Sequence, residues 1–125
     1  MPGKSVLAIG IDPAFVDFTT LPGLTPELVR NHIDAELDRV RAAGFDIEGC
    51  LIDLGETAEA TIVAALKKRS FDCVMIGAGL REPAAHLLLF EMVVNLVHRL
   101  APNAGICFNR NPADTLDAVQ RRIEV

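Results

Sequence analysis

Four short apolar runs, each followed by a longer amphipathic stretch, dominate the pattern of the chain. The runs cover residues 6–11, 47–54, 73–78 and 105–108. They are apolar at successive positions and rich in β-branched residues, a pattern typical of strands buried on both faces. The stretches that follow them repeat apolar residues every three or four positions, as amphipathic helices do. The pattern therefore predicts alternating strands and helices.

Capping residues indicate where the helices begin and end. Thr25 precedes Pro26, and a threonine N-cap followed by proline at the first helical position is a typical helix start. Gly44 is expected to end this helix, because glycine readily adopts the conformation that terminates one. Further helices are expected over residues 57–69, over residues 83–100 and from Asn111 onward.

Strands that alternate with helices fold into right-handed β-α-β units, which place a parallel sheet between two layers of helices. With so few strands, the common strand order is 2-1-3-4, that of flavodoxin-like proteins. A chain of 125 residues, half of them apolar, is long enough for one hydrophobic core. We therefore predict a single α/β domain over residues 1–125, a three-layer α/β/α sandwich of flavodoxin-like topology with a four-stranded parallel sheet of order 2-1-3-4.

Charge and hydropathy narrow the classes of partner. The net charge is −5, whereas binding to nucleic acid or an anionic membrane needs clustered lysine and arginine. The basic cluster at residues 67–69 falls at an expected helix end, where cations favour the helix dipole. The apolar runs are too short to span a membrane, and the N-terminal residues do not resemble a signal peptide. We expect no nucleic-acid or membrane partner and a cytoplasmic location.

The three cysteines, Cys50, Cys73 and Cys107, each lie inside an apolar run. Their spacing matches neither a CxxC pair nor a cysteine and histidine metal site. They are typical of small core residues in a reducing compartment. The sequence accordingly predicts no metal and no cofactor.

Polar candidates for a binding site follow the ends of the predicted strands, where open α/β sheets bind their ligands. Gly77 and Gly79 would allow the backbone to approach a ligand closely. Arg81 supplies a cation suited to a carboxylate or phosphate. Together with Asn109 and Asn111, these residues predict a site for a small anionic ligand, although Asn111, like the threonine at position 57, is also explained as a helix cap.

His86 is the leading candidate for acid/base chemistry. It falls at the centre of the expected sheet-facing stripe, in the first turn of the helix over residues 83–100. There it could act as a general acid or base with Asp12 or Asp53 as its partner, and Arg81 would hold the substrate. The structural alternative is a histidine that bonds a backbone carbonyl at the edge of the core.

Two apolar segments point to contacts beyond the core. Residues 13–24 exceed the usual length of a β-α connection, and they could close over the site as a lid, pack permanently or contact a partner subunit. The helix around Leu87–Leu100 is too apolar for an exposed surface, which favours a homodimer formed through it.

Residues 52–59 and 106–109 carry a resemblance to a family of small bacterial proteins with a flavodoxin-like, receiver-like fold. The resemblance implies that fold and no particular activity. The motifs of the functional groups that share the fold are missing, because receivers need an acidic pair where this chain has Asp12 alone. The Ser/Thr/Gly-rich phosphate loop of flavodoxins and the Asp-x-His-x-x-Gly motif of cobalamin-binding domains are not found in the sequence either.

Three functions remain open at this point. The first is a homo-oligomeric module that binds a small anionic metabolite at the carboxyl ends of the strands. The second is a small cofactor-independent enzyme, a hydrolase, lyase or isomerase, that uses His86 with Asp12 or Asp53. The third is a structural or interaction protein that acts through its dimer interface.

Overall fold

The computed structural model describes residues 3–19 and 21–124. They form an α/β fold with a four-stranded parallel sheet of order β2-β1-β3-β4, so the predicted flavodoxin-like topology is confirmed. The predicted strands agree with the observed ones to within two residues at every end. The strands are β1 (Ser5–Ile11), β2 (Asp46–Ile52), β3 (Cys73–Ile76) and β4 (Gly105–Phe108).

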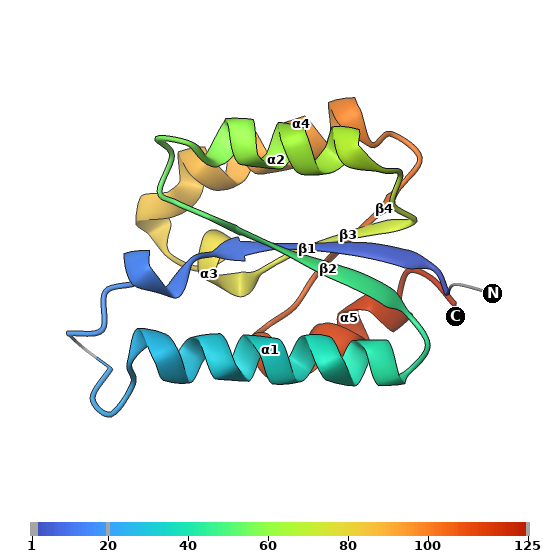
Figure 1. Ribbon diagram of the computed structural model, residues 1–125. Coiled ribbons are helices and arrows are strands. Elements are labelled where there is room, and N and C mark those ends of the chain that lie inside the picture. Colours follow the sequence, from blue (N-terminus) through green and yellow to red (C-terminus); the bar gives the residue numbers. More distant parts are fainter. Residues whose placement is uncertain (1–2, 20, 125) are drawn as a thin grey trace.

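Helices cover both faces of the sheet (Figure 1). On one face lie α2 (Ala58–Lys68) and α4 (Leu87–Leu100), and on the other lie α1 (Pro26–Ala42) and α5 (Thr115–Gln120). No helix within residues 3–19 and 21–124 combines the length and apolar character that crossing a membrane requires. The shorter elements are α3 (Ala78–Arg81) and the 3₁₀ turns η1 (Pro13–Phe15), η2 (Ala84–His86) and η3 (Pro112–Asp114).

The segment between β3 and α4 differs from the prediction. The single helix expected over residues 83–100 is a 3₁₀ turn followed by α4, and α3 was not expected. Pro83 is the physical reason, because it stands four residues after Gly79 and has no N–H with which to continue a helix from that carbonyl. The chain therefore turns between α3 and α4.

The two faces of the sheet carry side chains of different size. Toward α2 and α4, β1 presents Leu7, Ile9 and Ile11. Toward α1 and α5 it presents Val6 and Ala8 and then the glycine at position 10. The smaller side chains on the α1 face leave space near the carboxyl ends of the strands.

The three cysteines are buried, as expected, and we predict that their thiols do not react in the folded protein. Burial, and next the neighbouring Glu48 carboxylate, raise the pKa of Cys50 to about 11. The Sγ atoms of Cys73 and Cys107 lie 3.5 Å apart, and their hydrogen bond together with burial raises the pKa of Cys107.

The hydrogen bond to Cys107 lowers the pKa of Cys73, but burial keeps all three thiols from the reagent. Iodoacetamide at about pH 8 should therefore leave them unmodified in the native protein and modify them in urea. Mass spectrometry of the intact chain checks this. Rapid alkylation of Cys50 under native conditions would contradict it.

Candidate functional site

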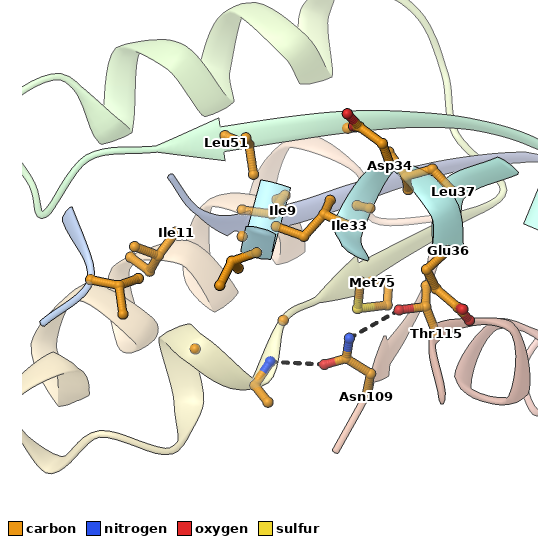
Figure 2. A pocket seen from close by; sticks show the side chains of 18 residues that line it. Ile9, Ile11, Ile33, Asp34, Glu36, Leu37, Leu51, Met75, Asn109 and Thr115 are labelled. Atoms are coloured by element: carbon orange, nitrogen blue, oxygen red, sulfur yellow. Dashed lines mark hydrogen bonds between the residues drawn. The ribbon is translucent and has the colours of Figure 1, made fainter. Parts of the chain in front are cut away.

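A cavity of about 420 Å³ lies between the sheet and α1, near the carboxyl ends of the strands (Figure 2). Gly10 and Leu51 line it from the ends of β1 and β2, and Gly77 lines it just after β3. Ile33 and Leu37 of α1 form the opposite wall. The cavity is therefore at the edge of the sheet where this class of fold binds ligands.

Small residues at paired positions create this cavity. In the parallel register, Ala8 of β1 stands beside Gly49 of β2, and Gly10 stands beside Leu51. A Cβ added to Gly10 would meet nothing nearer than Leu51 Cδ2, at 3.8 Å. Side chains missing from neighbouring strand positions thus contribute to this space.

The walls of the cavity are largely aliphatic. Val29 of α1 and Val16, from the segment after β1, complete the side near the carboxyl edge of the sheet. Among the described lining residues no side chain is aromatic. The polar lining side chains are Asp34, Glu36, Asn109 and Thr115.

Asn109 forms the neutral polar end of the cavity and is only 5% exposed. Its Oδ1 accepts a hydrogen bond from the Ala78 N–H at 2.8 Å, and its Nδ2 donates to Thr115 Oγ1 at 3.0 Å (Figure 2). One side chain therefore links the end of β4 with the starts of α3 and α5. No described residue accepts the second Nδ2 hydrogen.

The carboxylates lie at the borders of the cavity. Glu36 is buried beside Thr115, and its Oε1 accepts hydrogen bonds from Arg39 Nη1 and the Leu116 N–H, each at 3.3 Å. Asp34 is exposed and lies toward β2. Among the described lining residues there is no lysine, arginine or histidine.

Three of the five predicted ligand-binding residues line this cavity, namely Gly77, Gly79 and Asn109. Arg81 does not line it, because its Nη2 donates to the Asn109 carbonyl at 2.8 Å. Its buried Nε has no hydrogen-bond partner among the described residues. Asn111 also lies outside the lining and caps η3, accepting from the N–H two residues on at 2.8 Å. This capping role was the structural alternative for Asn111.

His86 is placed by the turn that Pro83 causes. Its Nδ1 lies 3.0 Å from the Gly79 carbonyl oxygen, which Pro83 cannot bond because it has no N–H. The imidazole therefore substitutes for a missing backbone donor. No hydrogen bond or ion pair among the described residues joins His86 to Asp12 or Asp53.

The two carboxylates of the enzyme hypothesis have structural partners instead. Asp12 Oδ1 accepts from the Ala14 N–H and forms an ion pair with Arg30. Asp53 Oδ2 accepts from the Thr57 hydroxyl at 2.6 Å, ahead of α2. Thr57 is the N-cap residue of α2, as expected, but its side chain makes no cap hydrogen bond and donates to Asp53 instead.

Asp53 is expected to make stability depend on pH. The hydrogen bond from the Thr57 hydroxyl, and next that from the Gly55 N–H, lower the pKa of Asp53 from its ordinary 3.8. A lowered folded-state pKa means that these bonds stabilise the fold above the unfolded-state pKa, and that this contribution is lost as the pH falls through the folded-state value.

We therefore expect Asp53→Asn to be less stable than the wild type near neutral pH and to approach it in acid. Thermal unfolding followed by circular dichroism over this range measures the difference, with Glu56→Gln on the same loop as control. A difference between Asp53→Asn and wild type that stays constant down to strong acid would contradict the assignment.

The segment after β1 contributes to the cavity. Val16 lines it, η1 packs against α1, and Phe15, Leu21 and Leu24 are exposed. That this segment closes over the cavity as a lid stays a prediction. Residue 20 of the segment lies outside the described residues.

Fold and cavity define the class of this chain as a flavodoxin-like α/β protein with an aliphatic cavity beneath α1. Neither protein-family models nor curated proteins match the sequence. Sequence reasoning missed Ala8, Gly10 and Gly49. The signal was available, because glycine inside a strand often marks a place where a ligand approaches closely.

Proposed function

We propose that this protein binds a small, largely apolar molecule in the cavity between α1 and the sheet. The observation that carries the proposal is the row of small residues, Ala8, Gly10 and Gly49, at adjoining strand positions. Side chains normally pack closely between a helix and the sheet that it covers. A volume of about 420 Å³ falls within the range of about 300–1,000 Å³ that ligand pockets occupy.

The lining supports a ligand different from the anionic one expected from the sequence. The charged lining groups are carboxylates, and the guanidinium of Arg81 is bonded to the Asn109 carbonyl outside the lining. A buried anion without a paired cation would be strongly disfavoured. The anionic ligand therefore stays a prediction that the lining does not favour.

The proposal is tested with N-phenyl-1-naphthylamine, a neutral probe whose fluorescence rises in apolar surroundings. We expect saturable binding of one probe per chain. Gly10→Val should abolish it, because its side chain occupies the cavity. Gly105→Ala is the control, since Gly105 at the start of β4 is outside the lining and a Cβ there meets Arg122 Cβ at 3.6 Å, an ordinary contact. Non-saturable binding, or equal binding by Gly10→Val and wild type, would exclude the cavity as the site.

The acid/base enzyme that uses His86 with Asp12 or Asp53 stays a prediction. The contacts made by these three side chains support structural roles for each of them. The observations therefore favour a binding protein over this enzyme.

The homodimer through the helix Leu87–Leu100 also stays a prediction, with exposed leucines at the start of α4 to test it. Leu87 is 63% and Leu88 is 76% exposed. If this face pairs with a second copy, Leu88→Lys should convert a dimer to a monomer in sedimentation velocity, because it places a charge in an apolar contact. Leu54→Lys, at a half-exposed position after β2, is the control. An unchanged sedimentation coefficient in Leu88→Lys would remove α4 from any interface.

A further inference from the structure

The aliphatic lining limits the kind of apolar group that the cavity suits. Ile33 and Leu37 of α1 lie opposite the strand glycines, Leu51 lies beside Gly10 in the sheet, and the described lining residues include no aromatic ring. Planar ring systems such as nucleobases or flavins gain much of their affinity by stacking on aromatic side chains. Branched and linear hydrocarbon chains need only the dispersion contacts that such walls supply. The lining therefore favours an aliphatic ligand.

The charges around the cavity favour a neutral ligand. An anion would find the carboxylates of Asp34 and Glu36 and no cation among the described lining residues. A cation would find Glu36 already paired with Arg39 and bonded by a helix N–H. Asp34 is exposed and therefore solvated. Neither an anion nor a cation would therefore find a free partner inside the cavity. A buried charge without a partner is strongly disfavoured, so a neutral ligand is favoured.

The amide of Asn109 specifies the polar group of the ligand. Its Oδ1 is occupied by the Ala78 N–H, and one Nδ2 hydrogen is occupied by Thr115. The other Nδ2 hydrogen has no acceptor among the described residues, although the side chain is almost completely buried and lines the cavity. A buried donor left without an acceptor costs free energy, so an acceptor on the ligand would stabilise the complex.

We infer that the ligand is a neutral aliphatic molecule that carries one hydrogen-bond acceptor, such as an alcohol, ester or amide. The acceptor takes the remaining hydrogen of Asn109 Nδ2, and the hydrocarbon chain lies along Ala8, Gly10 and Gly49. This inference rests on the proposed function, and it goes further by naming the head group and its partner.

Three eight-carbon molecules that differ only in head group test the inference. Octan-1-ol, octanoate and octylamine compete with N-phenyl-1-naphthylamine at neutral pH, where the second is anionic and the third cationic. We expect the alcohol to displace the probe at concentrations about tenfold or more below those of either charged molecule, because only its head group needs no counter-charge.

Each other result overturns the inference in a distinguishable way. If octanoate binds more tightly than octan-1-ol, the cavity prefers an anionic ligand. If octylamine binds more tightly, the cavity prefers a cationic ligand that pairs with the carboxylates. If the probe binds wild type and not Gly10→Val, but no competitor displaces it, the inferred ligand class fails and the proposed function stands. If neither the probe nor octan-1-ol binds the wild type, the latter measured by isothermal titration calorimetry, the proposed function fails.

Asn109→Asp tests the assigned partner. An aspartate keeps an oxygen for the Ala78 N–H and removes both Nδ2 hydrogens. We expect methyl heptanoate, an ester that can only accept hydrogen bonds, to bind about fivefold or more weakly to this variant, and octylamine to bind more tightly than to wild type. Circular dichroism confirms the fold, and the wild-type competition series decides the ligand class even if this variant does not fold. Unchanged affinity for methyl heptanoate in a folded variant would remove Asn109 from the head-group site.

Discussion

Gly10→Val is expected to raise the free energy of unfolding by about 2 kcal/mol while it abolishes probe binding. The added side chain enters the cavity, where its nearest neighbour at the Cβ would be Leu51 Cδ2 at 3.8 Å. Burial of each hydrocarbon group contributes about 0.8 kcal/mol. Replacement of a strand glycine also removes chain entropy from the unfolded state. Function and stability are therefore opposed at this position.

Urea unfolding of Gly10→Ala and Gly10→Val measures this effect, with the alanine variant expected to be intermediate. Gly77→Val is the matched control, because a Cβ at Gly77 would lie 3.3 Å from the Ile9 carbonyl oxygen and 3.7 Å from Gly10 Cα. It should destabilise the protein. If Gly10→Val and Gly77→Val destabilise equally, no space is available beside Gly10 and the cavity does not exist in solution.

Asn109→Ala is expected to lower the free energy of unfolding by about 2–4 kcal/mol. The substitution removes two hydrogen bonds of a side chain that is 5% exposed. The buried Ala78 N–H loses its acceptor, and a buried donor without a partner costs about 1–3 kcal/mol. The loss of packing where β4, α3 and α5 meet adds to this cost.

Asn111→Ala is the matched control for this prediction. Asn111 is exposed and caps η3 through one side-chain hydrogen bond, so its replacement should cost about 1 kcal/mol. Urea unfolding of both variants gives the comparison. Equal losses in the two variants would mean that the Asn109 network does not hold the polar end of the cavity together.

Much of the fold could be predicted from local sequence patterns. The β-branched runs and the Thr25-Pro26 helix start act over a few residues, and the structure has Thr25 Oγ1 accepting from the Leu28 N–H. The end of α1 was also predictable, because Gly44 adopts a φ of 103°, which glycine tolerates best. The region around Pro83 differed, because α3 precedes it and the 3₁₀ turn η2 replaces the start of the expected helix. The helix expected from Asn111 onward likewise begins as the 3₁₀ turn η3.

The candidate site could be predicted only in part. The rule that open α/β sheets bind ligands at the carboxyl ends of their strands predicted Gly77, Gly79 and Asn109. All three line the cavity. The same rule added Arg81, and the sheet-facing stripe of the expected helix added His86; both side chains satisfy backbone carbonyl groups instead. A polar residue near a strand end can serve the ligand or the chain, and the sequence alone does not distinguish the two uses.

The sequence by itself determined the alternation of strands and helices, because this follows from local periodicity and capping. The flavodoxin-like order of the sheet was predicted as the common one for so few strands, and the tertiary structure established it. Only the tertiary structure decided where the cavity lies. Ala8 and Gly49 are far apart in the chain, and they create one hollow because the parallel register sets them side by side beneath α1. Likewise the partner of His86 depends on a carbonyl that Pro83 leaves unbonded. Each of these contacts joins residues whose spacing in the sequence does not reveal their proximity in space.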